Sequence, residues 1–357
     1  MSKLSKILIF FGSIGVILVI ISFVLGTKIE DFEAMMTDSA SYTHMEQEYE
    51  LTSDTFDLKI DTWSNEVKIV KADTTKVNIS YYKHEKDDVT ESYLNGKITF
   101  SISRKWYNVI YYFAPISEYR EMVVTIPNDK EIGNLNVDVS SGGLKFDGIN
   151  VTNSINVKSS SGNIEIKNVN TPTISVKVSS GNYKLINATA TSVVLSAKSG
   201  NLFVDNVDAS SLHLEANSGN ISLSNLNVED LYVKLSSGIT KINDSYVSVA
   251  NIFSNSGLVT INDTTIKTVN EMKLSSGNVT MNDVDIEKLN LRVSSARIEI
   301  NFRTNVSHYR INVDQSSGNL KINNNSYDSD YNNGISNVDY YIVIKTSSGN
   351  VRLKWPS

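Results

Sequence analysis

Three Asn-Asp pairs recur at nearly even intervals along the second half of the chain. They are Asn243-Asp244, Asn262-Asp263 and Asn282-Asp283. If the three segments stack as neighbouring strands, their carboxylates lie about 5 Å apart along one edge. Carboxylates about 5 to 10 Å apart carry out glycoside hydrolysis, and clusters of oxygen ligands bind Ca²⁺. Two kinds of chemistry must therefore be weighed here: hydrolysis of a polysaccharide and binding of calcium.

Four earlier segments carry asparagine where these three carry aspartate. The four residues are Asn168, Asn187, Asn206 and Asn225. Asn and Asp both favour turns, because their side chains can hydrogen-bond the local backbone. A turn position that accepts either residue is therefore favoured over a calcium site at Asp244, Asp263 and Asp283, and a catalytic role ranks last.

A second oxygen-rich segment runs from Asn324 to Gly334 and contains Asp328 and Asp330. Its glycine falls one place late for the calcium loop of an EF-hand, where glycine is the sixth residue. We favour a solvated loop and keep Asp328 and Asp330 as the remaining calcium candidates. No other cofactor is expected, because the chain has no cysteine and its four histidines are far apart in sequence.

Motifs typical of enzymes are missing from the sequence. It contains no Gly-x-Ser-x-Gly, no P-loop, no His-Glu-x-x-His and no dinucleotide-binding fingerprint. We therefore predict a protein that is not an enzyme. A solenoid enzyme acting on polysaccharide is kept as the third hypothesis, because such enzymes can assemble sites from adjacent coils.

One short segment combines basic and aromatic residues. Arg104, Lys105, Trp106 and Tyr107 follow an alternating strand pattern. Cations and aromatic rings can both face a glycan or a lipid headgroup, so the segment is a candidate contact surface. The favoured alternative is a hairpin whose aromatic rings pack on a sheet.

These candidates are positioned by a repeat that occupies most of the chain. The phrase Ser-Gly-Asn recurs at Gly162, Gly181, Gly200, Gly219, Gly277, Gly318 and Gly349, with looser copies at Gly142, Gly238 and Gly257 and with Ala296 in place of glycine. Most copies are 19 to 20 residues apart. A fixed period of this length indicates a repeat array.

Each repeat reads as two short strands. Apolar residues stand two and four positions after the glycine, as at Leu202 and Val204, and a second alternation precedes the next glycine, as at Leu212 and Leu214. Such a unit buries its apolar face only by stacking, which predicts an all-β fold: a parallel β-solenoid, or β-helix, of about 19–20-residue coils. A β-propeller is less compatible, because its blades need about 40–50 residues.

Asparagines at equivalent places in successive coils can form amide ladders. The first predicted ladder contains Asn163, Asn182, Asn201 and Asn220, and the second contains Asn243, Asn262, Asn282, Asn301 and Asn323.

A β-rich region and an apolar segment precede the array. Alternating strands such as Phe56–Ile60 predict an N-terminal β region at 51–137, before a solenoid at 138–357. The run Ile7–Leu25 is long enough, at about 1.5 Å per residue, to cross a bilayer as one helix. The expected order is a tail at 1–6, a transmembrane anchor at 7–26 and a stalk at 27–50. A cleaved signal peptide is the rival interpretation, but this run is longer than such apolar cores usually are.

Charge and orientation predict the location and partners. Lys3 and Lys6 precede the apolar run, which places the N-terminus in the cytoplasm and the bulk of this single-pass membrane protein outside. The net charge of −6 argues against nucleic acid. The expected partners are the membrane, through Ile7–Leu25, and cell-wall glycan or envelope proteins.

The alternating strands at Phe56–Ile60 and Val67–Ile69, the strand end at Val123–Pro127 and the repeated Ser-Gly-Asn phrase resemble a bacterial family. This is the "putative adhesin", or toastrack, β-strand-repeat family of unknown function, and the likeness covers about residues 51–357. The resemblance implies a membrane-anchored envelope protein and supplies no catalytic residues. The expected function is a non-catalytic, adhesin-like or envelope-associated binding scaffold. A sensor or regulatory component of an envelope-stress system is the alternative.

Overall fold

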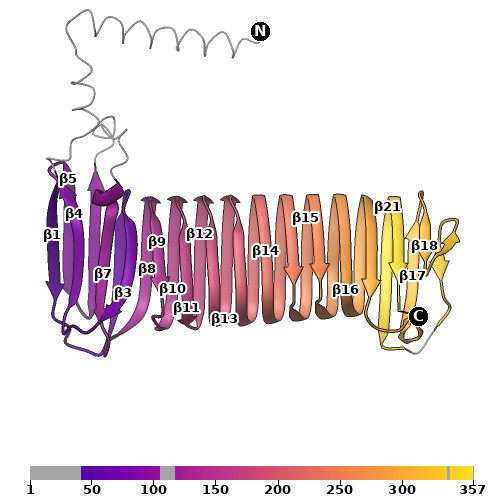
Figure 1. The fold of residues 1–357 in the computed structure, drawn as a ribbon, viewed down its shortest axis with the longest axis horizontal. Helices are drawn as coiled ribbons and strands as arrows, with labels where there is room; N and C mark the ends of the chain where they lie inside the picture. The colour runs from indigo at the N-terminus through magenta and orange to yellow at the C-terminus, as the bar shows by residue number, and fades with distance from the viewer. Residues whose placement is uncertain (1–41, 105–116, 336–337, 357) are drawn as a thin grey trace, which may run out of the picture.

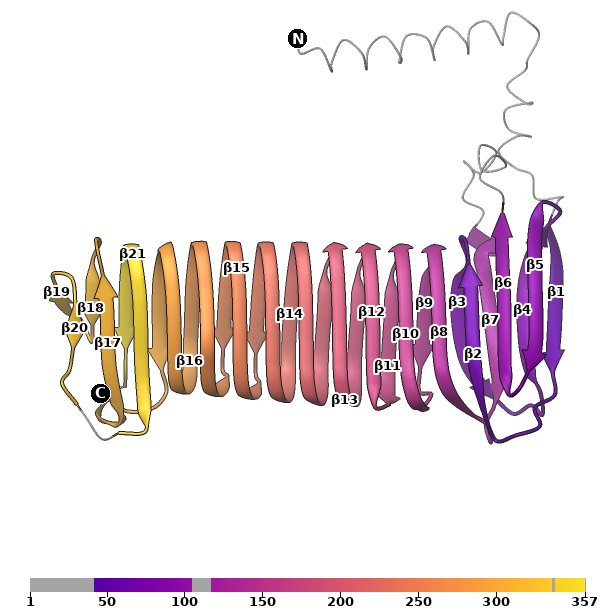
Figure 2. The ribbon, with the colours of Figure 1, turned by 180° about the vertical axis from the view of Figure 1, so that it is seen from behind.

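Apolar side chains at every second residue build a long rod of stacked β-strands (Figure 1). The computed structural model describes residues 42–104, 117–335 and 338–356. The ribbon winds around one continuous core, and the view from behind shows the same stacking (Figure 2). The prediction of an all-β solenoid is confirmed for these residues.

The regular part of the rod consists of parallel coils. Its strands are β8 (Glu131–Ser141), β9 (Gly143–Asp147), β10 (Val151–Ser161), β11 (Ile164–Asn170), β12 (Thr173–Ser180), β13 (Tyr183–Ser199), β14 (Leu202–Asn243), β15 (Tyr246–Asn262) and β16 (Thr265–Phe302). Tyr183 pairs with Leu202, so one coil takes 19 residues. From Asn251, which pairs with Glu271, one extra residue makes the step 20. The predicted period is confirmed.

The inward positions of each coil form the core. Ile221 and Leu223 follow the corner at Gly219 and are fully buried, as are Leu212 and Leu214 before it. Burying one such aliphatic side chain stabilises the fold by about 1.5–3 kcal/mol. Because every coil repeats this pattern, the core runs the whole length of the rod.

The corner glycines are required by close backbone packing. A Cβ atom on Gly219 would lie 1.9 Å from the carbonyl oxygen of Gly200, and the φ angle of Gly219 is +123°. Ala296 is the exception, and it is buried at its own corner. The next glycine in the stack, Gly349, would meet the carbonyl oxygen of Ala296 at 1.8 Å.

The region before the array continues the same stack. Its elements are β1 (Tyr42–Tyr49), β2 (Thr55–Thr62), β3 (Glu66–Ala72), β4 (Val77–His84), β5 (Asp87–Leu94), β6 (Lys97–Arg104), the 3₁₀ helix η3 (Ser117–Arg120) and β7 (Glu121–Pro127). β2 and β3 pair in parallel with β8 and β9 on one side and with β6 and β7 on the other. The first coil in sequence is therefore the second in space.

Antiparallel strands close this end of the rod. β5 pairs with β6, β4 pairs with β7, and β1 pairs with β4. An exposed parallel edge would offer unpaired backbone groups to other chains. Here β5 and β4 pair antiparallel with β6 and β7, and so cover the outermost parallel coil.

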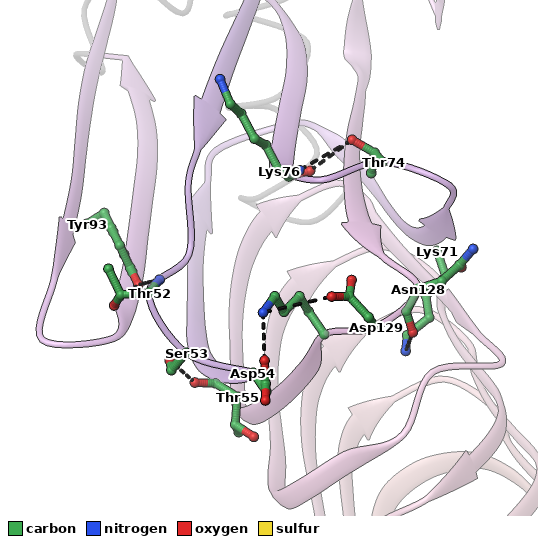
Figure 3. A network of polar contacts seen from close by, with 11 residues as sticks. Thr52, Ser53, Asp54, Thr55, Lys71, Thr74, Lys76, Tyr93, Asn128 and Asp129 are labelled. Atoms are coloured by element: carbon green, nitrogen blue, oxygen red, sulfur yellow. Dashed lines mark hydrogen bonds and ion pairs between the residues drawn. The ribbon is translucent and has the colours of Figure 1, made fainter.

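Polar contacts hold the turns at this end together (Figure 3). The ammonium of Lys130 contacts the carboxylate of Asp54 at 2.7 Å, and Lys71 donates to the backbone carbonyl of Asn128 at 3.0 Å. Tyr93 on β5 lies 3.2 Å from the hydroxyl of Thr52. These contacts tie the turn after β7 to β3 and to the segment before β2, and they tie that segment to β5.

At the other end the chain doubles back. The elements are the 3₁₀ helix η4 (Val306–His308), β17 (Tyr309–Gln315), β18 (Leu320–Ile322), β19 (Asn325–Tyr327), β20 (Tyr331–Asn332) and β21 (Tyr340–Lys354). β21 pairs in parallel with β16 on one side and with β17 and β18 on the other. The last coil in sequence therefore lies between β16 and the coil of β17 and β18 that precedes it in the chain. At both ends of the rod, the terminal coil in sequence is thus the second coil in space.

The predicted transmembrane anchor at Ile7–Leu25 lies outside the described residues. Among residues 42–104, 117–335 and 338–356, no helix is long and apolar enough to cross a bilayer.

Candidate binding groove

A groove follows the corner edge of the rod near its N-terminal end. It has a volume of about 930 Å³ and is lined by residues of η3, of the start of β3 and of the first coils of the array. Arg120 and Glu66 lie at one end of the groove. Phe203 lies three coils further along the stack than Lys145. The groove therefore runs along the stack, across several coils, and is suited to an extended ligand.

The wall of the groove is a row of outward side chains. Lys145, Glu165, Lys184 and Phe203 each stand three residues after a corner glycine, between the two inward apolar positions. Backbone pairing sets Lys145 opposite Glu165, Glu165 opposite Lys184, and Lys184 opposite Phe203. Neighbouring strands lie about 4.8 Å apart, so the row presents alternating charges and then a half-buried aromatic ring.

Ion pairs fix part of this row. The ammonium of Lys145 lies 2.5 Å from the carboxylate of Glu66, and this hydrogen bond raises the pKa of Lys145. Glu165 pairs with Lys167 on its own strand, and that hydrogen bond lowers the pKa of Glu165. Lys184 is exposed and forms no ion pair with any described residue. It is the cation of the wall without an ion pair of its own, although its charge helps to lower the pKa of the neighbouring Glu165.

The first predicted amide ladder borders the groove and is confirmed over Asn163, Asn182 and Asn201, whereas Asn220 joins it through its backbone nitrogen and not its side-chain amide. The amide nitrogen of Asn182 donates to the side-chain oxygen of Asn163 at 3.3 Å, and that of Asn201 donates to Asn182 at 2.9 Å. The backbone nitrogen of Asn220 donates to Asn201 at 3.2 Å. Each amide keeps further donor or acceptor capacity toward solvent. Amides, charges and an aromatic ring together can recognise the hydroxyl groups and apolar ring faces of a glycan.

The second predicted ladder is confirmed over four of its five members. Asn262 donates to Asn243 at 2.8 Å, Asn282 to Asn262 at 3.0 Å, and Asn301 to Asn282 at 2.9 Å. Including Asn323 was wrong. Its side-chain oxygen accepts from the backbone nitrogen of Trp355 at 2.8 Å, because β21 separates its coil from that of Asn301.

The three aspartates of the Asn-Asp pairs occupy positions with left-handed backbone. Asp244, Asp263 and Asp283 have φ angles of 49°, 50° and 53°, and Asn168, Asn187, Asn206 and Asn225 share this conformation. Asn and Asp adopt left-handed backbone more readily than other side chains do. The favoured interpretation as a turn position thus has a direct structural cause. Asp283 also contacts Arg303 at 3.0 Å.

The calcium candidates lie on the surface of the rod. Asp244, Asp263, Asp328 and Asp330 are exposed, and Asp330 accepts a hydrogen bond from the backbone nitrogen of Gln315 at 3.1 Å. Within the described part of the chain, no group of three or more His, Asp or Glu side chains is arranged to hold a metal ion. A calcium site at these residues stays a prediction.

The predicted contact surface at Arg104 needs correction. Its side chain is only 3% exposed and contacts the carboxylate of Asp87 at 2.6 Å. The hairpin of β5 and β6 pairs these two residues directly, so the guanidinium faces inward rather than toward a ligand. Lys105, Trp106 and Tyr107 lie outside the described residues.

The groove residues were missed at the level of sequence, although a signal was present. Alignment on the corner glycine identifies the inward positions, and the residue between them must face outward. Reading that outward position coil by coil gives Lys145, Glu165, Lys184 and Phe203. Arg120 could not be placed this way, because it lies outside the repeat.

Comparison with known proteins identifies one family. The model of the Toastrack DUF4097 family matches residues 56–238 and, in a second match, residues 192–354. No curated protein matches the chain.

Three solved structures are similar to parts of the chain. A "putative adhesin" from Bacteroides fragilis NCTC 9343 shares 18% identity, with 61% of this chain and 96% of that one covered and a TM-score of 0.37. A "putative adhesin" from Parabacteroides distasonis ATCC 8503 shares 11%, with coverages of 72% and 96% and a TM-score of 0.32. A "putative cell adhesion protein" from Clostridium sporogenes ATCC 15579 shares 10%, with coverages of 88% and 100% and a TM-score of 0.20.

Proposed function

Because the chain belongs to the Toastrack DUF4097 family, we propose that it is a non-catalytic binding scaffold of the cell envelope and that the groove beside Lys184 is its binding site. The apolar run Ile7–Leu25 would anchor it in the membrane as a single-pass protein, with the rod outside. The ligand would be an extended glycan of the envelope.

The groove itself is the observation that carries this proposal. It spans several coils, and its wall combines the exposed ammonium of Lys184 with the ring of Phe203 beside the amide ladder of Asn182 and Asn201. A long polar ligand can contact successive coils at a spacing of about 4.8 Å. A rigid rod holds these groups in place, so little conformational entropy is lost on binding.

A pull-down from intact envelopes tests the proposal. The full-length protein should retain glycan, and Lys184→Ala combined with Phe203→Ala should retain much less. Lys241→Ala is the matched control, because Lys241 is an exposed lysine at the same position of a later coil and does not line the groove. If wild type and the double variant retain equal glycan, or none, the groove is not a glycan site.

A further inference from the structure

A second row of outward residues becomes strongly basic at the C-terminal end of the rod. Lys273, Arg292 and Lys345 each stand four residues before a corner, at Gly277, Ala296 and Gly349. Arg292 and Lys345 are direct partners in the pairing of β16 with β21. Lys273 lies one coil before Arg292, as the hydrogen bond from Arg297 to Asn278 in the same pair of coils confirms.

The insertion of β21 creates this cluster. The coil that follows β16 in sequence carries Asp314 at the equivalent position. Had the coils stacked in chain order, Asp314 would lie opposite Arg292 as its natural counter-charge. β21 instead sets Lys345 between them, with Arg292 on one side and Asp314 on the other.

The three cations are exposed, and none forms an ion pair within the described part of the chain. Like charges directly opposite each other on neighbouring strands destabilise a sheet. The three adjacent cations therefore repel one another, and the carboxylate that flanks them is that of Asp314, opposite Lys345. The arrangement therefore lowers stability unless an anion neutralises it.

A concavity lies against these residues. It has a volume of about 270 Å³, and its lining contains all three cations and Asp314 together with the hydroxyl-bearing residues Ser294, Ser316 and Ser347. A tetrahedral phosphate offers several acceptor oxygens, which suits donors that converge from adjacent coils. Arginine can bind such a group with two parallel hydrogen bonds, and lysine contributes point charge on either side.

We propose that Lys273, Arg292 and Lys345 form an anion site for phosphate groups carried on a linear polymer. The polymer would run across the strands, along the rod axis, so that successive phosphates meet successive coils. The site is independent of the groove beside Lys184. Whether or not phosphate binds here, the proposed binding of glycan in the groove is unaffected.

Calorimetric titration of the full-length protein with linear inorganic polyphosphate tests the site. Wild type should bind it, with an affinity that falls as salt is added, since exposed charges are screened within about 10 Å at 0.1 M ionic strength. Arg292→Gln combined with Lys345→Gln should weaken binding by roughly a hundredfold, because two charged donors are lost and each charge-assisted hydrogen bond contributes about tenfold. Orthophosphate should bind more weakly than the polymer.

Lys158→Gln combined with Lys177→Gln is the matched control. These exposed lysines also stand four residues before a corner and pair directly with each other, but they do not line the concavity. The control should bind polyphosphate as wild type does. If both double variants lost the same amount of polyphosphate affinity, general surface charge would explain the binding, and the proposal would be overturned.

Two further variants separate binding from folding. Lys345→Glu should abolish binding with little change in melting temperature, because the carboxylate that it places opposite Arg292 also lies opposite Asp314. Asp314→Asn should strengthen binding by removing the flanking negative charge. A wild type that does not bind polyphosphate, or an Asp314→Asn variant that binds it more weakly, contradicts the site.

Discussion

The carbonyl oxygen of Gly181 lies 1.7 Å from the place that a Cβ atom on Gly200 would occupy. No side chain fits there unless the two coils move apart. The same relationship recurs from Asn65 and Gly142 to Gly349 and Gly318 at the far end. Along this column of corners the backbones of successive coils therefore lie too close together for a side chain at the glycine positions.

Gly200→Ala should destabilise the protein by about 3 kcal/mol, because it adds a backbone clash to the strain of a φ angle of +141°. Urea denaturation monitored by circular dichroism measures the change. Gly96→Ala separates the two causes: its φ angle is +72°, but nothing lies within 4 Å of the added atom. It should cost about 1 kcal/mol. Equal losses at the two sites would contradict the role of close packing.

Tyr183→Phe should raise stability by about 1 kcal/mol. The hydroxyl of Tyr183 is buried without a hydrogen-bond partner among the described residues, and burial raises its pKa far above the ordinary value. The melting temperature of the variant gives the measurement. Tyr49→Phe is the control, since the Tyr49 hydroxyl donates to Glu91 at 2.7 Å, and it should lower stability. A destabilised Tyr183→Phe would show that the hydroxyl has a partner after all.

Asp87→Ala should cost about 3 kcal/mol of unfolding free energy, because it takes away the carboxylate that the buried guanidinium of Arg104 contacts. Chemical denaturation against wild type measures the loss. Glu48→Gln is the control: Glu48 and Lys76 form an exposed pair, and such pairs contribute about 0–1 kcal/mol. If both substitutions had the same small effect, Arg104 would not depend on Asp87.

The pair of Asp54 and Lys130 should make stability pH-dependent. The hydrogen bond from Lys130 lowers the pKa of Asp54 below its ordinary 3.8. The folded protein then binds this proton less readily than the unfolded chain. The contribution is therefore fully present above pH 3.8 and is lost as the pH falls through the lowered pKa. The same bond raises the pKa of Lys130, so that contribution is lost only as the pH rises past the raised value.

The difference in urea midpoint between wild type and Asp54→Asn measures this dependence. It should stay constant from neutral pH down to about 5 and shrink below about 4. A difference that does not change with pH would mean that the carboxylate charge has no part in it.

The regular part of the fold could be predicted from the sequence because one physical constraint repeats. Gly200 and its equivalents mark where backbones touch, and the apolar pair at Leu202 and Val204 marks the core strand. The amide ladder from Asn163 to Asn201 follows from the same register. Each of these is a local consequence of stacking, so every coil shows it.

The ends of the rod could not be predicted in this way. The repeat gives the register within a coil but not the order of coils in space, which depends on the path of the connecting segments. For that reason the place of β21 beside Arg292 was not foreseen, nor was the separation of Asn323 from Asn301. The burial of Arg104 likewise depends on the hairpin that brings Asp87 opposite it.

Only part of the candidate groove could be predicted from the sequence. The outward row at Glu165 and Lys184 follows from the repeat, but a row of polar side chains exists along the whole rod. What distinguishes these coils is the nearby Arg120 at the end of η3, which no periodicity reveals.

The most direct test of the binding groove is photo-crosslinking in intact envelopes. A photo-reactive amino acid replaces Lys184 in one full-length variant and Lys241 in another, and the crosslinked products are analysed for glycan. Glycan attached at position 184 and absent at position 241 is the predicted result. Equal crosslinking at both positions, or glycan at position 241 alone, would contradict the assignment of the groove as the binding site.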